Sequence, residues 1–377
     1  MPSKGLPVTP ALITWARTRA GLSIDDAKNF GKIDEWERGE SGPTYPQLEA
    51  LAAALKVPVA VFFFPEPPNV PDVAQTFRTL PDTEFEQIPG RVKLLLRKAK
   101  AFQLNLMDLT GGRNPAPRLI VRDLKFDAKT NLVDAANGLR AYLGVSLETQ
   151  QSWQDDEVAL KAWRQALQDV GIYIFKDAFK VDEFSGFCLF DDVFPLIYVN
   201  NSSAKTRQIF TLFHELAHLL FNTSGIDTLH GDYIAKLQGD PKNIEVFCNR
   251  CAAEFLFPEN VFSTEMKGRK ATEATAEQLA ARYHVSREFV FRRFLDRNWI
   301  DEAAYTEAAK RWSQQRGGGS GGDYYWTKLS YLGRDYVALA LAEFHQNRIS
   351  ETQLAEYLDT KPKNLAGIED YFARGSS

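Results

Sequence analysis

The stretch T-L-F-H-E-L-A-H-L-L, residues 211–220, contains the residues whose types and spacing point most directly to a chemical role. His214 and His218 are four residues apart, so on a helix both imidazoles project from the same face. This spacing allows two ring nitrogens to reach one zinc ion, which binds histidine nitrogen at about 2.0–2.1 Å. Glu215 is then placed to take a proton from a zinc-activated water. The motif therefore predicts zinc chemistry with a glutamate base.

A catalytic zinc needs a third protein ligand and an open fourth position. The candidates that follow His218 in the chain are His230, Glu245, Cys248, Cys251 and Glu254. Residues 244–257 contain no helix breaker and are expected to form a second helix, on which Glu245 and Asn249 share a face. This arrangement suggests a carboxylate ligand and an amide that hydrogen-bonds a ligand histidine.

Two further pairs of residues near this region have alternative interpretations. His230 and Tyr233 lie in the loop between the two expected helices, where either side chain is a candidate to polarise a substrate carbonyl. A surface position without a role is the alternative for His230. Cys248 and Cys251 form C-x-x-C, but they fall within an apolar helix and lack a second such pair, which favours core packing over redox or zinc chemistry.

The stretches F-T-L-F-H-E-L-A-H-L-L-F and I-E-V-F-C-N-R-C-A-A-E-F-L-F-P, preceded by F-P-L-I-Y-V-N, resemble the ImmA/IrrE family of bacterial metallopeptidases. The resemblance implies a zincin-like core with His214, His218 and Glu245 as zinc ligands and Glu215 as general base. It also implies a regulatory endopeptidase that cleaves a specific protein, such as a transcriptional repressor encoded nearby. The alternative is an antitoxin-like or regulatory binding protein, with a DNA-binding repressor as one form, in which the peptidase fold is mainly a scaffold.

The N-terminal residues 1–68 are expected to form short helices, and they resemble an Xre-type helix-turn-helix module through L-S-I-D-D-A-K, W-E-R-G-E and L-E-A-L-A-A-A-L. Between Ala27 and Trp36 the chain is several residues shorter than is usual for that family, in the region of the DNA-reading helix. The first 66 residues contain 7 Lys/Arg and 8 Asp/Glu, so they have no excess of positive charge for contacts with DNA phosphates. Packing or protein contact is therefore favoured over operator binding, and DNA stays a doubtful partner.

Other elements must position these groups. Strand-like composition in G-I-Y-I-F, S-G-F-C-L-F and P-L-I-Y-V-N among helical segments predicts a mostly helical α+β fold. After the N-terminal module we expect a connector with a helix at 69–118, a peptidase domain at 119–265, a helical extension at 266–316, a Gly/Ser linker at 317–322 and a helical tail at 323–377. The extension holds a second, arginine-rich helix-turn-helix pattern, for which packing beside the core is favoured over DNA contact.

Composition and net charge limit the class of protein that this sequence can encode. The 377 residues are 44% hydrophobic and 25% charged, which is typical of a globular protein with two or three domains. A net charge of −4 gives no general attraction to nucleic acid or to anionic membranes. No apolar run approaches the length of a membrane span, the N-terminus lacks a signal-peptide core, and three cysteines are too few for a disulfide framework. We therefore expect a cytoplasmic protein without a membrane partner.

Overall fold

The computed structural model describes residues 5–20, 24–55, 57, 59–67, 88–181, 183–228, 239–314 and 322–375. Two compact units make up the chain. The first comprises residues 1–76 with 93–101, and the second comprises residues 77–92 with 102–377. Each unit has its own hydrophobic core.

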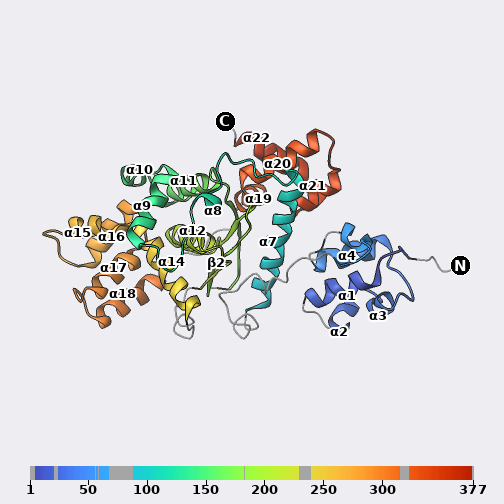
Figure 1. Ribbon diagram of the computed structural model, residues 1–377, viewed down its shortest axis with the longest axis horizontal. Coiled ribbons are helices and arrows are strands. Elements are labelled where there is room, and N and C mark those ends of the chain that lie inside the picture. Colours follow the sequence, from blue (N-terminus) through green and yellow to red (C-terminus); the bar gives the residue numbers. More distant parts are fainter. Residues whose placement is uncertain are drawn as a thin grey trace. The chain divides into compact units, whose positions relative to one another are not determined.

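The first unit is a bundle of short helices (Figure 1). Its elements are α1 (Pro10–Arg19), α2 (Ile24–Ala27), η1 (Lys28–Phe30), α3 (Ile33–Glu37), α4 (Tyr45–Leu55) and η2 (Val59–Phe63). Leu12, Trp36 and Leu48 are among the buried side chains of its core. Arg17 of α1 donates two hydrogen bonds to the carboxylate of Glu37 in α3, at 2.6 and 3.0 Å, and joins the two helices.

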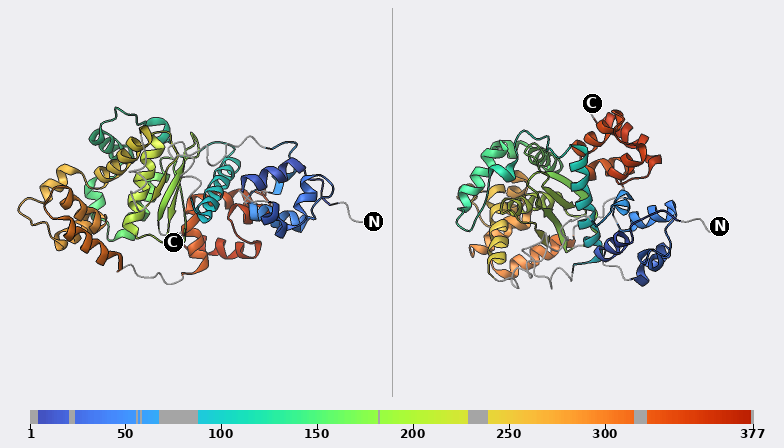
Figure 2. Two further views of the ribbon diagram at one scale, coloured as in Figure 1. Left: turned by 90° about the horizontal axis from the view of Figure 1, so that it is seen from below. Right: turned by 45° about the vertical axis from the view of Figure 1, so that its right-hand side comes forward.

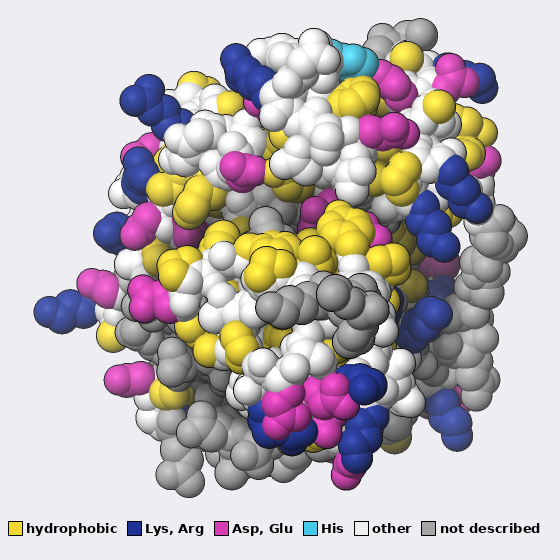
Figure 3. All heavy atoms as spheres, turned by 90° about the vertical axis from the view of Figure 1, so that its right-hand side faces the viewer, with side chains coloured by type: hydrophobic (Ala, Val, Ile, Leu, Met, Phe, Trp, Pro, Cys, Tyr) yellow, Lys and Arg dark blue, Asp and Glu magenta, His cyan; other side chains and the backbone are white. Residues whose placement is uncertain are grey.

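Helix α3 occupies the place where a DNA-reading helix was considered, and it has only five residues. Ile33 and Trp36 are buried in the bundle, while Asp34 and Glu35 carry negative charge in the first turn. On the face drawn in Figure 3, Lys/Arg and Asp/Glu side chains are intermixed and form no continuous basic surface. The short, acidic α3 therefore agrees with the shortened sequence, and its charge does not favour contact with phosphates.

The second unit contains a four-stranded sheet with the order β1-β3-β2-β4. Its strands are β1 (Tyr173–Asp177), β2 (Phe184–Leu189), β3 (Leu196–Asn200) and β4 (Ile226–Thr228). β1 and β3 are parallel, whereas β2 is antiparallel to both β3 and β4. The register between β2 and β4 shifts at residues 184–186. The predicted mostly helical α+β fold is confirmed.

Helices cover both faces of this sheet. Figure 2 shows α12 (Lys205–Leu220) on one side of it, with the end of α7 (Gly90–Leu109) on the other. On one face, α12 (Lys205–Leu220) packs with α9 (Leu132–Leu143), α11 (Asp156–Gln168) and α14 (Asp240–Leu256) over a large apolar core. On the other face lie the end of α7 (Gly90–Leu109) and α20 (Arg334–His345). There Phe102 stacks on Phe175 of β1 with ring centroids 4.4 Å apart, and Tyr336 of α20 meets Phe102 edge-on at 5.4 Å.

The remaining helices extend the two helical layers. On the α12 side they are α8 (Ile120–Asp123), α10 (Leu147–Ser152), α15 (Glu259–Glu265), α16 (Glu273–Tyr283), α17 (Arg287–Asp296) and α18 (Glu302–Gln314). The C-terminal region adds α19 (Tyr324–Leu332), α21 (Glu351–Tyr357), η3 (Pro362–Asn364) and α22 (Leu365–Arg374). Apart from Gly322, the Gly/Ser linker expected at 317–322 lies outside the described residues. Among the described helices, none combines the length and apolar character that a bilayer crossing requires.

The arginines of the second helix-turn-helix pattern, α16 and α17, are paired with carboxylates. The pairs are Arg282 with Glu265 at 2.9 Å, Arg287 with Glu277 at 3.8 Å, Arg292 with Asp296 at 3.0 Å, and Arg297 with Glu259. Arg293 is largely buried and lies over the rings of Phe257, Phe262 and Phe289. The basic charge of this pattern is therefore used within the fold, which favours packing over phosphate contact.

Candidate metal centre

Aromatic packing sets the orientation of α12 and thus of the motif on it. Phe213 stacks on Phe255 of α14 with ring centroids 4.1 Å apart, and it meets Trp163 of α11 edge-on at 4.8 Å. Because Phe213 fixes one side of α12 against these two helices, His214 and His218 point to another side. The second helix, α14, runs beside α12 and brings Glu245 to the two histidines.

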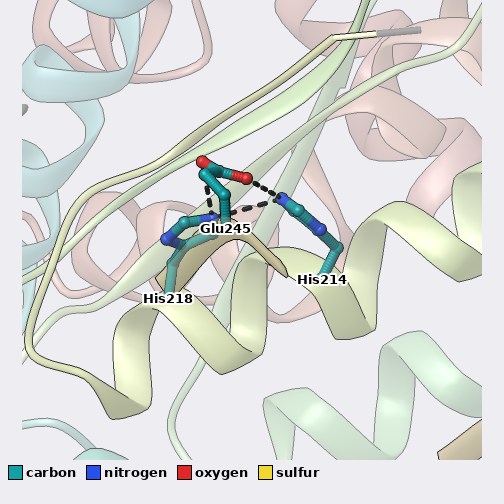
Figure 4. Close-up of side chains that lie close together, drawn as sticks. All are labelled: His214, His218 and Glu245. Atoms are coloured by element: carbon teal, nitrogen blue, oxygen red, sulfur yellow. Dashed lines mark hydrogen bonds and ion pairs between the residues drawn. The ribbon is translucent and has the colours of Figure 1, made fainter. Parts of the chain in front are cut away.

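His214, His218 and Glu245 converge on one point from these two helices (Figure 4). The Nε2 atoms of the two histidines are 3.2 Å apart. Glu245 places Oε2 3.5 Å from the Nε2 of His214 and Oε1 3.2 Å from the Nε2 of His218. All three side chains are buried, with 0–2% of each residue exposed. The structure thus brings together two imidazoles and a carboxylate away from bulk water.

This geometry fits a zinc ion. Ligand atoms about 2.0–2.2 Å from one zinc at tetrahedral angles lie roughly 3.3–3.5 Å from one another, close to the observed separations. Two ring nitrogens that face each other share at most one proton, so at least one lone pair beside the carboxylate is available to a cation. Two nitrogens and one oxygen also form a donor set that zinc accepts in catalytic sites.

Glu215 is fully buried one residue after the first histidine. Neither of its carboxylate oxygens has a hydrogen bond of ordinary geometry to a described residue. Burial raises the pKa of Glu215 to about 8, against the opposing effect of His218, and the charge of Asp227 raises it further. The Cys188 thiol also contacts this carboxylate and acts to lower its pKa, so the raised pKa is the result of burial.

The two histidines differ in protonation when no metal is present. Burial lowers the pKa of His214, so this imidazole is readily neutral. Burial also acts to lower the pKa of His218, but the Cys248 thiol and the Glu245 carboxylate outweigh it and hold the pKa well above its usual value. Because a metal ligand must be neutral imidazole, metal binding at His218 displaces a proton that Glu245 otherwise stabilises.

A buried ionic network adjoins the histidines on α12. Arg207 donates to both oxygens of Asp227 at 2.8 and 2.9 Å, and Thr211 donates to Asp227 at 2.9 Å. Arg207 also donates to Ser185 of β2 at 2.9 Å. The network fixes α12 against β4 and places a negative charge close to His214 and Glu215. The sequence shows that Arg207 and Thr211 share a face with the histidines, but it does not mark Asp227 as their partner.

Gly225 lies against the ring of His218. A Cβ atom added at Gly225 would lie 2.6 Å from Cδ2, 2.7 Å from Cγ and 3.0 Å from Nε2 of His218. The glycine itself is held by Cys188 of β2, whose N–H donates to the Gly225 carbonyl at 3.0 Å, while the Gly225 N–H donates to Sγ at 3.2 Å. Gly225 carries no signal in the sequence, because a glycine after a helix is typical of an ordinary turn.

The other candidates from the sequence are placed as follows. Asn249 donates its side-chain amide to the backbone carbonyl of Glu245 at 3.2 Å rather than to a ligand histidine. Glu254 accepts the backbone N–H of Glu259 and so satisfies the start of α15. His230 and Tyr233 lie outside the described residues. Like Cys188, the C-x-x-C residues Cys248 and Cys251 are buried free thiols of the core.

Comparison with known families adds to this geometry. Residues 167–295 match the model of the IrrE N-terminal-like domain, Peptidase_M78, and this segment contains the three converging side chains and Glu215. The match supports the ImmA/IrrE assignment. The IrrE-like segment covers about a third of the chain and does not include the N-terminal bundle. The resemblance of that bundle to an Xre-type module therefore remains a prediction. No curated protein matches the chain.

Proposed function

We propose that this protein is a zinc-dependent endopeptidase of regulatory type, which cleaves a specific protein. The observation that carries the proposal is the buried convergence of His214, His218 and Glu245 beside the buried carboxyl group of Glu215, within an IrrE-like segment. A metallopeptidase needs these elements: three ligands, a base, and a separation of the site from bulk water.

Each side chain has a distinct role in this proposal. His214, His218 and Glu245 hold the metal, and a zinc ion at this position supplies Lewis acidity that acidifies water and polarises a peptide carbonyl. Glu215 removes a proton from the attacking water and then delivers it to the leaving amine.

The sheet offers a place for an extended substrate. β4 ends the strand order, and among the described residues it pairs with β2 alone. An extended peptide can therefore add beside β4 through main-chain hydrogen bonds, as in other cases of strand addition. Since β4 contacts the motif helix α12, a peptide bound there would pass close to the metal centre.

The substrate class follows from the resemblance to ImmA/IrrE proteins, which implies a repressor or another product of a neighbouring gene as the target. The competing proposal is a binding protein of antitoxin type that engages the same partner without cutting it. DNA as a partner is disfavoured by the five-residue α3 and by the paired arginines of α16 and α17.

The deciding experiment compares the wild type with Glu215→Gln and His218→Ala. Metal analysis should find about one zinc per chain in the wild type and in Glu215→Gln, and far less in His218→Ala. Each protein is then incubated with the neighbouring gene product, and both partners are analysed by intact mass spectrometry. Specific cuts by the wild type alone support the peptidase. A stable complex without cuts, equal for wild type and Glu215→Gln, supports the binding protein, and cleavage by Glu215→Gln refutes the role of the base.

A further inference from the structure

A second site lies within the second unit, away from the metal centre. A cavity of about 460 Å³ opens between the loop 114–117, the end of α11, the start of β1 and one face of α20. Tyr173 of β1 lines it, whereas the next residue, Ile174, belongs to the core beneath α12. Because neighbouring residues of a strand point to opposite faces, the cavity and the motif helix lie on opposite sides of the sheet.

The wall formed by the loop is held in place by one side chain. Asn114 donates its amide to the carbonyls of Gly171 at 3.0 Å and Val193 at 2.6 Å, and its oxygen accepts the N–H of Ala116 at 3.0 Å. The prolines Pro115 and Pro117 flank this anchor and give the wall an apolar surface. The loop is thus fixed without a ligand, as expected for a pre-formed binding site.

The opposite wall is one face of α20. Asp335, Ala338, Leu339 and Ala342 line the cavity, and their spacing of three and four residues places them on one side of the helix. Tyr336, on another side, is buried and donates its hydroxyl to the Tyr357 carbonyl at 2.9 Å, so the helix is anchored on the side away from the cavity. The two alanines leave the space that the cavity occupies.

The cavity has a negative rim. Asp169 and Asp335 line it, and no lysine or arginine does. Each carboxylate accepts a hydrogen bond from a neutral amide, Gln165 for Asp169 at 2.8 Å and Gln168 for Asp335 at 3.0 Å. In the described part of the chain neither carboxylate forms an ion pair within 4.0 Å, so both charges are available to a ligand.

The nearby Arg164 forms no ion pair with Asp169 or Asp335 in the described part of the chain. Burial lowers the pKa of Arg164 to about 10, and the charge of Asp335 acts against this effect. The guanidinium, however, donates to the carbonyls of Ser330 and Ile174 and so holds α19 and β1 together. Arg164 therefore connects α19 with β1, and it is not among the residues that line the cavity.

The cavity is also lined by a tyrosine. Tyr173 is 6% exposed as a whole residue, and it borders the cavity next to Ile172. Burial holds its pKa above the usual value, so the group stays a neutral hydroxyl that can accept or donate a hydrogen bond. A ligand in the cavity can therefore form a hydrogen bond with this hydroxyl.

We propose that this cavity binds an aliphatic organic cation, a protonated amine or guanidinium on a short hydrocarbon stem. The positive group pairs with Asp335 and Asp169, and it or a neighbouring N–H reaches the Tyr173 hydroxyl. Pro115, Pro117 and Leu339 enclose the stem. A neutral ligand would leave the rim charges uncompensated, and an anion would be repelled by them.

Two sources can supply this chemistry: a free amine or guanidine, and the Lys or Arg side chain of a polypeptide. The volume exceeds that of one such side chain and lies within the usual range of ligand pockets. Binding by the free probe butylguanidinium is compared with binding by the blocked dipeptide acetyl-Leu-Arg-amide. Tighter binding of the dipeptide supports a polypeptide source, and tighter binding of the free cation supports a small molecule.

The test measures binding to the full chain by calorimetry and by ligand-observed NMR. The wild type should bind butylguanidinium saturably at concentrations on the order of millimolar, as expected for a ligand of this size. The neutral analogue butylurea should bind at least about tenfold more weakly, because it lacks the charge that the rim recognises. Asp335→Asn should weaken butylguanidinium binding about three- to tenfold, in line with the modest strength of exposed charge pairs.

Two more variants locate the site. Tyr173→Phe removes only the hydroxyl and should also weaken binding several-fold, while Ala338→Trp fills the cavity and should abolish it. Asp370→Asn removes an exposed carboxylate of α22 that does not line the cavity, and it should change nothing. Thermal unfolding and zinc content establish that each variant is folded. Failure of the wild type to bind the probe saturably, equal binding of butylurea, or full binding by folded Ala338→Trp overturns the proposal.

Discussion

Substitution of Gly225 by alanine tests whether the ring of His218 is held in place by close packing. The added Cβ would start 2.6 Å from Cδ2 of this ring, whereas carbon atoms in contact lie about 3.5–4.0 Å apart. One of the two must therefore move by roughly 1 Å. Gly225 is held on both sides by hydrogen bonds to Cys188, so we expect the ring of His218 to give way.

A ring shift of this size is large for a metal ligand. Zinc–ligand distances in real sites vary by about ±0.2 Å, so a displaced Nε2 can no longer meet the geometry set by His214 and Glu245. We expect zinc affinity to fall about 10- to 100-fold, or roughly 1.4–2.7 kcal/mol, comparable to the loss of a group that orients a ligand. The backbone of Gly225 is not in the left-handed region, so alanine adds no backbone strain there.

The assay is a competition for zinc between the protein and a chromophoric chelator, with cobalt absorption spectra as a second measurement of ligand geometry. Gly138→Ala is the matched control: a Cβ at Gly138 meets nothing within 4 Å, and the residue lies within α9. This control should bind zinc like the wild type and gain about 0.5–1 kcal/mol of stability from better helix propensity. A folded Gly225→Ala protein with wild-type zinc affinity and an unchanged cobalt spectrum would refute the argument.

Three further predictions concern stability, each measured by denaturant unfolding. Burial lowers the pKa of Lys176 in β1 from 10.5 to about 7. Between these two pH values the unfolded chain holds a proton that the folded chain lacks, so the free energy of unfolding rises with pH. The burial of the charged amine destabilises the fold fully below pH 7 and no longer does so above pH 10.5. Lys176→Met should remove this slope and stabilise the protein at pH 6 by on the order of 2–5 kcal/mol, and an unchanged slope would contradict it. Asp227→Ala leaves Arg207 and Thr211 without their acceptor and should cost about 3–5 kcal/mol, whereas a loss below about 1 kcal/mol would show that the network is not structural. Tyr336→Phe removes a buried hydroxyl that bonds two partners and should cost about 1–3 kcal/mol, with Tyr324→Phe on the exposed surface as its control.

Much of the metal centre could be predicted from local spacing. The four-residue intervals within α12 and within α14 determine which side chains share a face, and this alone placed His214 with His218 and pointed to Glu245 as a candidate. The family resemblance then selected Glu245 from the alternatives. The mostly helical α+β class followed from composition and periodicity in the same way.

The remaining parts of the site depend on contacts between segments that are distant in sequence. Asp227 meets Arg207 only because β4 pairs with β2 and lies against α12. The role of Gly225 depends on the distance between its backbone and a ring seven residues earlier in the chain, which no residue pattern encodes. Asn249 shares the face of Glu245 as expected, but its amide bonds to the backbone within the same helix. The spacing of residues in the sequence predicts which side chains share one face of a helix. Tertiary packing determines which other residues that face contacts.

The aromatic layer on the second face of the sheet has a consequence for the integrity of the chain. Phe102, from before the sheet, and Tyr336, from after α18, both pack on Phe175, and Asn105 hydrogen-bonds Tyr336. Residues that follow position 321 are therefore attached to the rest by buried non-covalent contacts as well as by the peptide chain. A protease nick between residues 314 and 322 should leave two fragments that migrate together in gel filtration and separate only in denaturant.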